Sequence, residues 1–233
     1  MDVLAELGDE SVARIAGRCR SVTLARRDGL GPTAEPSAAL LAIEEGYVLI
    51  GADFRNGDGH VPVGRRVVVA TGQRGTLLAP PALGERLEAV TQARVTIVSA
   101  DSLRLLLGFP KVAEAIVEAF TDSLRERQWS LRNCTYVRHT ERVRHTLIQL
   151  ARTYGHVVPS GIRVDFPLTH QLLADMVGSA RETVSIALSE LAQEGFLLRQ
   201  HRRYVVRVRT HDLRLLDARP DAAPALAGKT RHL

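Results

Sequence analysis

The hydrophobic pattern of the chain changes at about residue 100, and no other feature constrains the fold as strongly. From residue 19 to residue 99, apolar residues stand in short runs that are separated by turns containing Gly or Pro. Many short strands with regular turns are typical of a small barrel or roll. The expected strands are Cys19–Leu24, Leu40–Ile43, Tyr47–Phe54, Arg66–Ala70, Gly75–Leu78 and Ala93–Ser99, with a hairpin turn at Asn56-Gly57-Asp58-Gly59.

Beyond this region the spacing becomes helical. Residues 111–133 contain neither Gly nor Pro, and apolar residues recur there at intervals of 4, 3, 4 and 7. This heptad-like seam predicts a long helix that contacts a second copy of the chain. A second stripe, Val112 and Ile116, indicates that the helix also packs on its own roll; the alternative is a helix that packs only within its own domain. The expected dimer interface consists of Ala113, Val117, Phe120, Leu124 and Leu131, with Arg127 interrupting the apolar seam.

Composition excludes several classes of protein. Hydrophobic residues make up 45% and charged residues 24%, as in an ordinary globular protein. No apolar run approaches the roughly 20 residues that span a bilayer, and the acidic N-terminus lacks the pattern of a secretory signal. Cys19 and Cys134 stand too far apart for a metal-ligand motif, and no catalytic constellation is present. We therefore expect a cytoplasmic protein that is not an enzyme, holds no metal and has no membrane partner.

Positive charge is concentrated in the second half of the chain. Residues 1–124 contain 13 Lys or Arg and 16 Asp or Glu, a net charge of −3, whereas residues 125–209 contain 14 and 7, a net charge of +7. A cationic segment of this kind suits a polyanion such as nucleic acid. Charge alone leaves open a solvated Arg-rich surface without such a partner.

The segment from Leu168 to Arg209 predicts two short helices joined by a Gly turn. Thr169 can cap the first helix, Gly178 supplies the turn, and Ser179-Ala180-Arg181-Glu182 has the pattern of a capping box at the start of the second. A third helix is expected before them at 139–154, ended by Gly155. In the second short helix, Val184, Leu188 and Leu191 should face inward, and Glu182, Ser185, Ile186 and Ser189 should face outward.

A basic β-ribbon is expected to follow the two helices. Its strands are Phe196–Gln200 and Tyr204–Val208, and residues 201–203 form the tip of this wing. A helix with a polar N-terminal outer face can enter the major groove of DNA, where an Arg reads guanine and a Glu accepts from cytosine. A plain helical hairpin with a ribbon is the alternative. The expected DNA contacts are Thr169, His170, Gln171, Ser179, Arg181, Glu182, Ser185, Ile186, Ser189, His201, Arg202 and Arg203.

The stretch RETVSIALSELAQEGFL, preceded by LTHQLLADMVGSA, resembles the C-terminal winged helix of the Crp–Fnr transcription regulators. The resemblance is strong over 137–210 and extends more weakly to the whole chain, because a β-roll, a long helix and then a winged helix is the order of that family. It implies an α+β fold and a homodimer that binds a palindromic operator in double-stranded DNA. It also implies RNA polymerase as a partner and a small-molecule effector that binds in the roll.

The sequence departs from the cyclic-AMP-binding members of that family. Their phosphate cassette carries Gly-Glu-Leu and then Arg-Ser or Arg-Thr, whereas this chain has Gly75-Thr76-Leu77 and no such pair. Losing the cation that pairs with the phosphate removes a contact of about 1.5–3 kcal/mol, so cyclic AMP is not the expected effector. No cofactor is predicted, because the chain has no cysteine cluster for iron–sulfur and only incidental haem ligands in His60 and Cys19. Another anion could meet the residues of a possible effector pocket, namely Thr76, Arg86, Arg127 and Gln128.

The sequence thus predicts four parts. They are a roll over 1–110, a dimerisation helix and hinge over 111–136, a winged helix-turn-helix domain over 137–210, and a short helix with a disordered tail over 211–233. The leading interpretation is a sequence-specific DNA-binding regulator. The alternative is a ligand-sensing module that acts mainly through protein contacts, and the basic wing argues against it.

Overall fold

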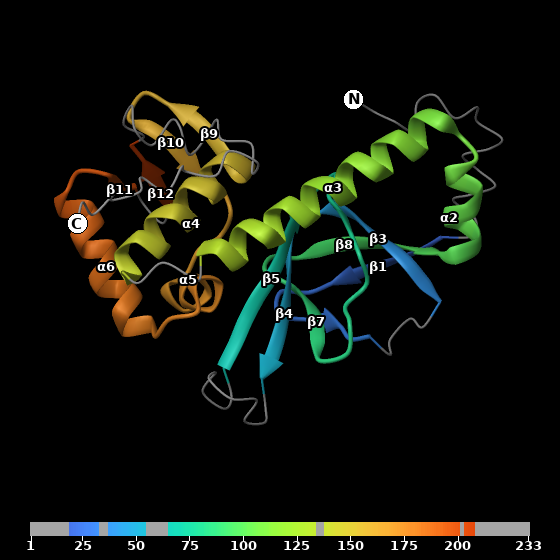
Figure 1. Ribbon diagram of the computed structural model, residues 1–233, viewed down its shortest axis with the longest axis horizontal. Helices are drawn as coiled ribbons and strands as arrows, with labels where there is room; N and C mark the ends of the chain where they lie inside the picture. Colours follow the sequence, from blue (N-terminus) through green and yellow to red (C-terminus); the bar gives the residue numbers. More distant parts are fainter. Residues whose placement is uncertain (1–18, 33–36, 55–64, 134–137, 201–202, 208–233) are drawn as a thin grey trace, which may run out of the picture.

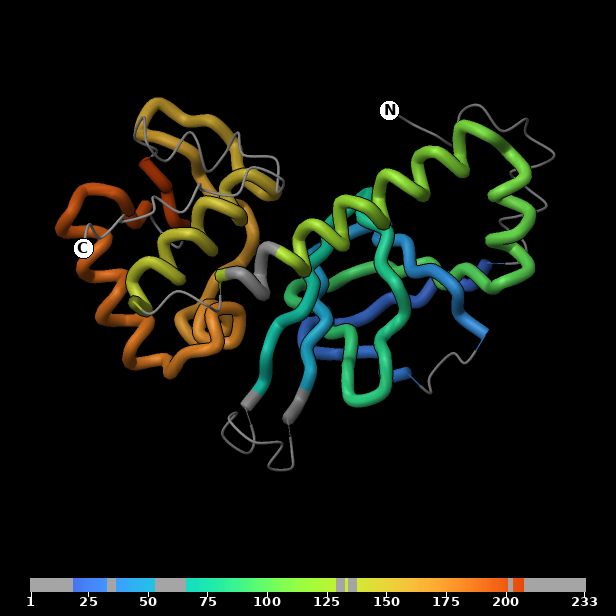
Figure 2. Tube along the Cα trace, in the orientation of Figure 1, coloured from blue at the N-terminus to red at the C-terminus, as the bar shows by residue number. Residues whose placement is uncertain are grey.

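The computed structural model consists of two lobes that are consecutive in the sequence, with one long helix, α3, running from the first to the second (Figures 1 and 2). It describes residues 19–32, 37–54, 65–133, 138–200 and 203–207. The short amphipathic helix that the apolar spacing predicts over residues 1–16, the hairpin turn predicted at 56–59 and the predicted tail over 211–233 lie outside the described residues. The order of a roll, a long helix and a winged helix-turn-helix is confirmed.

The first lobe is a roll of two antiparallel four-stranded sheets, in the orders β1-β8-β3-β6 and β2-β7-β4-β5. Their apolar faces enclose one core, in which Val48, Ile50, Leu87 and Val95 are fully buried. The strands are β1 (Arg20–Leu24), β2 (Gly29–Leu30), β3 (Ala38–Glu45), β4 (Tyr47–Phe54), β5 (Arg65–Gln73), β6 (Leu77–Leu78), β7 (Glu85–Ala89) and β8 (Ala93–Ser99).

All six expected strands are present, but β2 and β7 were not expected. In β7, Leu87 and Ala89 are buried on one face, Arg86 between its strand neighbours is exposed, and the strand begins with the charged Glu85 on the buried face. A five-residue strand with three charged side chains offers little apolar signal of its own, so its place becomes clear only from its pairing with β4. A two-residue strand such as β2 is too short to show an alternation of apolar and polar residues.

Two helices follow the roll. Ser99 caps α2 (Ala100–Leu107) by accepting a hydrogen bond from the Ser102 amide at 3.3 Å, and α3 spans Pro110–Asn133. Val112 and Ile116 are buried against Leu40, Val98 and Leu106 in a second core. The long helix therefore packs on its own roll through the stripe that the sequence predicts for this purpose.

The second lobe is a three-helix unit with a four-stranded sheet of order β11-β12-β10-β9. Its helices pack around Val143, Leu147, Phe166 and Leu191. The hairpin of β9 and β10 was not expected, because Gly155, which ends α4, also begins a strand. The elements are α4 (His139–Tyr154), β9 (Gly155–Val158), β10 (Gly161–Val164), α5 (His170–Val177), α6 (Arg181–Gln193), β11 (Leu197–Gln200) and β12 (Arg203–Val206).

An aromatic cluster joins the lobes. Tyr47 of the roll lies edge-on to Tyr154 and Phe166 of the second lobe, with ring centroids 6.0 and 5.3 Å away. The Tyr154 hydroxyl donates to Thr71 Oγ1 of β5 at 2.6 Å. Burial raises the pKa of this phenol, so Tyr154 stays protonated and keeps its role as donor.

Candidate nucleic-acid interface

Helices α5 and α6 form a tight helix-turn-helix. Thr169 caps α5, its hydroxyl accepting from the Leu172 amide at 3.1 Å, as the sequence predicts. Gly178 ends α5 with a φ of 63°, a left-handed conformation that a glycine adopts without strain. This turn brings the inner face of α6, with Val184, Leu188 and Leu191 buried, onto the core of the lobe.

The expected capping box at the start of α6 is wrong. The N-cap is Ala180, which has no side-chain bond to the helix, and Ser179 is only 5% exposed. Ser179 Oγ shares a hydrogen bond of 2.9 Å with His139 Nδ1 at the start of α4, so its hydroxyl is withdrawn from the surface. The Ser179 hydroxyl is therefore engaged within the lobe, and a contact between Ser179 and DNA stays a prediction. Because the N-cap Ala180 has no side-chain acceptor, it leaves the first backbone N–H groups of α6 uncapped. A helix N-terminus of this kind suits an anion.

The outer face of α6 is polar, with one apolar side chain in it. Arg181, Glu182 and Ser189 are exposed, and Ile186 is 62% exposed, as the helical spacing predicts. Ser185 is half-buried, because its hydroxyl lies 2.8 Å from His170 Nδ1. That bond joins the first turns of the two helices and fixes where α6 stands on α5.

His170 lies near two arginines, Arg181 and Arg199, of which the sequence analysis named only the first. Burial lowers the pKa of His170, and the charges of Arg199 and Arg181 lower it further, so the ring is neutral near pH 7. Arg199 is exposed on β11 and was missed as a candidate site residue. Strand alternation could not have revealed it, because Leu197 and Arg199 share a face of β11, and Leu197 is buried while Arg199 is exposed.

The described part of the wing is held by Asp165. Arg203, which the sequence assigns to DNA phosphates, donates to the Asp165 carbonyl and lies 3.6 Å from its carboxylate. The hydrogen bond from Arg163 is the main cause of the lowered pKa of Asp165. The carboxylate of Asp165 therefore stays ionised. Arg203 remains partly exposed and is anchored within the lobe. His201 and Arg202 lie outside the described residues.

The remaining candidates on α5 are exposed or partly exposed. Thr169 and Gln171 lie on the surface, and Gln171 donates to Asp175 Oδ1 at 2.8 Å one turn further along the helix. The structure thus brings Thr169, His170, Arg181 and Ser185 together at the shared N-terminal end of the two helices. Their contact with DNA stays a prediction.

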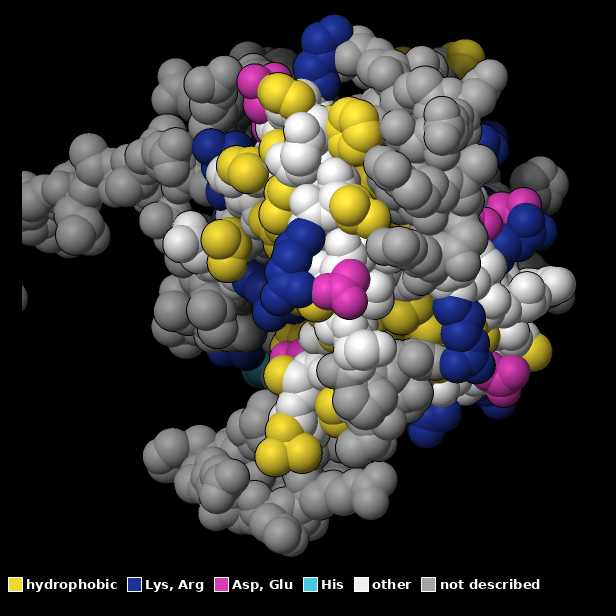
Figure 3. All heavy atoms as spheres, turned by 90° about the vertical axis from the view of Figure 1, so that its right-hand side faces the viewer, with side chains coloured by type: hydrophobic (Ala, Val, Ile, Leu, Met, Phe, Trp, Pro, Cys, Tyr) yellow, Lys and Arg dark blue, Asp and Glu magenta, His cyan; other side chains and the backbone are white. Residues whose placement is uncertain are grey.

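The outer stripe of α3 is the second candidate surface. Val117 and Leu124 are each 61% exposed and lie two turns apart, while Ala113 and Phe120 are half-buried. Phe120 also packs on the core beneath α2, and the Arg127 side chain is partly buried. The side chain of Leu131 lies outside the described part. Figure 3 looks onto the end of the molecule where α2 and α3 meet and shows hydrophobic side chains gathered on this face.

The four residues of the predicted effector pocket are not gathered around a cavity in the described part of the chain. Thr76 is used in its own turn, where its hydroxyl accepts from the Gln73 amide at 3.0 Å. Arg86 and Gln128 are exposed. A cavity exists instead at the junction of the lobes, and none of the four lines it. The described residues contain no cluster of three or more His, Cys, Asp or Glu side chains that could hold a metal ion.

Residues 141–218 match the family model of the Crp-like helix-turn-helix domain. The chain carries a Crp-like helix-turn-helix domain. A relative in Mycobacterium tuberculosis, the CRP-like cAMP-activated global transcriptional regulator, is 29% identical over 109 residues, 46% of this chain and 49% of the relative. The global nitrogen regulator of Synechococcus elongatus is 26% identical over 102 residues, 44% of this chain and 46% of that one. The aligned part thus spans about half the length of these curated relatives.

Solved structures share the fold beyond the Crp-like domain. A variant of CooA from Carboxydothermus hydrogenoformans superposes with a TM-score of 0.73 at 19% identity, covering 89% of this chain and 91% of that one. FixK2 from Bradyrhizobium japonicum superposes with a TM-score of 0.66 at 23% identity, covering 86% and 98%. The roll, the long helix and the Crp-like domain are therefore arranged as in known structures. No helix in the described ranges is both long and apolar enough to cross a membrane.

Proposed function

We propose that the protein is a sequence-specific DNA-binding transcription regulator of the Crp–Fnr type. The observation that carries the proposal is the outer face of α6, where Arg181 and Glu182 stand exposed at the N-terminal end of the second helix of a Crp-like domain. An α-helix fits the major groove, and Arg and Glu side chains at its start can read a G·C pair each. Arg199, which lies near His170 and Arg181, adds positive charge that favours the phosphates.

The regulator acts as a homodimer through α3 and binds a palindromic operator. The exposed pair of Val117 and Leu124 supports this, because two apolar side chains seven residues apart form a coiled-coil seam. A two-fold dimer places its recognition helices about 34 Å apart, one turn of DNA. Sedimentation at micromolar concentration should give a dimer, and a stable monomer would contradict this part of the proposal.

Operator binding at several salt concentrations tests the main proposal. A site is first selected from random double-stranded DNA, and the affinity for it is then compared with that for a scrambled duplex. A specific DNA binder shows a palindromic motif and a steep linear fall of log affinity with log salt. Failure to enrich any motif, with no salt-dependent affinity, would favour a module that acts through protein contacts.

The effector is not cyclic AMP, although a relative is named as activated by that nucleotide. The support is chemical: the hydroxyl of Thr76 is used within the 73–76 turn, and no Arg-Ser or Arg-Thr pair follows it. Calorimetry with cyclic AMP should give no micromolar binding, because the charge-assisted contact to the phosphate is missing. A dissociation constant in the micromolar range or below would overturn this assignment.

A further inference from the structure

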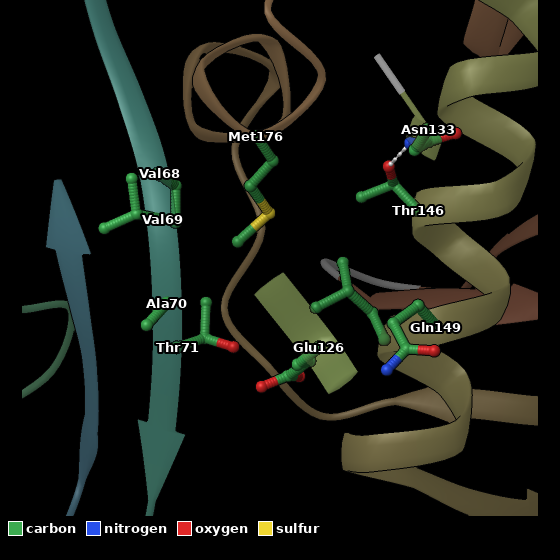
Figure 4. A pocket seen from close by; sticks show the side chains of 10 residues that line it. Val68, Val69, Ala70, Thr71, Glu126, Asn133, Thr146, Gln149 and Met176 are labelled. Atoms are coloured by element: carbon green, nitrogen blue, oxygen red, sulfur yellow. Dashed lines mark hydrogen bonds between the residues drawn. The ribbon is translucent and has the colours of Figure 1, made fainter. Parts of the chain in front are cut away.

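The junction of the two lobes encloses a cavity of about 50 Å³. Its walls come from β5 of the roll, from α3, and from α4 and α5 of the Crp-like domain, as Figure 4 shows. Val68 and Met176 form part of the apolar wall. The polar side chains around it are Thr71, Glu126, Asn133, Thr146 and Gln149.

Glu126 is the only acidic residue among the described residues that line this cavity. Burial raises the pKa of Glu126 to about 7, and the charge of Asp122 adds to this effect, against a hydrogen bond with Gln149. The titratable or charged groups that act on Glu126 are Asp122 on α3 and Tyr154 on α4, and the cavity residues from β5 and α5 carry no charge. Among the described side chains, no Arg or Lys forms an ion pair with Glu126. Within the described part of the chain, the Glu126 carboxylate therefore has a hydrogen bond with Gln149 but no counter-ion.

Asn133, near the end of α3, adds a buried oxygen that has no partner among the described residues. Its amide nitrogen donates to Thr146 Oγ1 at 2.9 Å and to the Arg142 carbonyl at 3.1 Å. Its oxygen Oδ1 is buried and has no hydrogen-bond donor among the described residues, and the residue is only 4% exposed. Because buried polar atoms in folded proteins are nearly always paired, this oxygen marks a place where a donor belongs.

The size of the cavity limits what can enter it. One water needs roughly 10–15 Å³ of such space, so about 3–5 non-hydrogen atoms fit. The Glu126 carboxylate is the one ionisable acid among the described residues that line the cavity, and it is an acceptor. Its best complement carries N–H donors and a positive charge, because hydrogen bonds between ionised groups are about twice as strong as neutral ones.

We propose that the cavity between β5, α3, α4 and α5 binds a small organic cation, a protonated amine or a guanidinium-type ion, with Glu126 as its counter-ion. The cation donates to the Glu126 carboxylate, and its carbon atoms pack on Val68 and Met176. Because the walls belong to both lobes, occupancy favours the arrangement in which β5 lies against α4 and α5. Binding in the cavity does not depend on DNA binding, so each can fail without the other.

Titration of the full-length protein with ethanolamine hydrochloride or guanidinium chloride tests the proposal. Sodium chloride at equal concentration is the control for ionic strength, and binding is followed by calorimetry and by NMR shifts at millimolar ligand. The cation binds the ionised carboxylate, so affinity should be about tenfold higher at about pH 8 than at about pH 6, on either side of the Glu126 pKa. Saturable binding with this pH dependence in the wild type supports the site even without a variant.

Two matched variants locate the binding. Glu126→Gln keeps the shape of the side chain and removes its charge, and it should abolish binding at both pH values. Asp122→Asn removes an exposed carboxylate one turn earlier on the same helix, and it should leave the affinity within about threefold. Absence of saturable binding in the wild type, equal affinity at the two pH values, or full binding by a folded Glu126→Gln protein would each overturn the proposal.

Discussion

Helices α3 and α6 expose apolar side chains to nearly the same extent, in very different settings. On α3, Val117 and Leu124 are each 61% exposed, and on α6, Ile186 is 62% exposed. The two residues on α3 lie seven apart and form one stripe along the helix. Ile186 stands singly, with Glu182 and Ser189 one turn away on either side.

The difference teaches that the neighbours of an exposed apolar side chain, more than its exposed fraction, indicate its partner. A stripe repeated every seven residues matches a second helix, because knobs of one helix fill holes of the other. An isolated Ile among polar residues at a helix N-terminus matches the major groove, whose one apolar feature is the thymine methyl. The predictions that follow test these two assignments separately.

The largest effect is expected on α3. Leu124→Arg should convert the protein to a monomer and reduce operator affinity by about 100-fold or more. Burying a Leu side chain stabilises an interface by about 1.5–3 kcal/mol, and a two-fold dimer holds two copies. Sedimentation and operator titration measure the two consequences together.

Leu83→Arg is the matched control for that change. Leu83 is 95% exposed on the loop before β7, away from the stripe of α3. The same substitution there should leave both the dimer and the operator affinity unchanged. Dimers of normal stability with Leu124→Arg would show that the outer stripe of α3 serves another partner.

The next effect is expected at the start of α6. Arg181→Ala should cost about 1–3 kcal/mol of operator affinity and relax specificity at one G·C position, with no effect on dimer formation. A binding selection from random DNA with the variant shows which position has lost information. Uniform weakening across all sequences would instead make Arg181 a phosphate contact.

A smaller effect is expected from Ile186→Ala. The contact with one thymine methyl is worth about 1 kcal/mol, so preference for thymine should fall at a single position per half-site. The dimer should be unaffected, in contrast to Leu124→Arg. Identical motifs from the wild type and the variant would show that Ile186 stops short of the DNA.

The smallest effect is expected at the wing. Arg203→Ala should weaken all DNA sequences alike and reduce the salt slope by about one unit. Arg203 already interacts with Asp165, and it must weaken that ion pair to bind a phosphate. The loss of DNA affinity in Arg203→Ala should therefore be modest. A changed sequence preference would contradict its assignment to the phosphates.

The parts of the fold that could be predicted are those encoded by neighbours in the sequence. The cap at Thr169 and the turn at Gly178 depend on partners within four residues, and both are confirmed. The capping box failed because Ser179 has a competing partner, His139, forty residues away. No local pattern contains that competition.

The cavity at the junction of the lobes could not be predicted from the sequence in the same way. The cavity of the junction takes Thr71 from β5, Glu126 from α3, Gln149 from α4 and Met176 from α5. These positions meet only after the two lobes are in place, so no spacing in the sequence links them. The strand β7 was missed for a related reason, since three of its five residues are charged and its place is set by pairing with β4, which is distant in the sequence.

The aromatic cluster of Tyr47, Tyr154 and Phe166 also limits how this protein can be recombined in evolution or in the laboratory. Phe166 is fully buried, and Tyr47 from the roll forms part of its cover. A graft that joins this Crp-like domain to a foreign sensor at the end of α3 would uncover large aromatic surface. The transferable unit is therefore the domain together with the ends of β4 and β5, a module whose boundary does not coincide with a single cut in the chain.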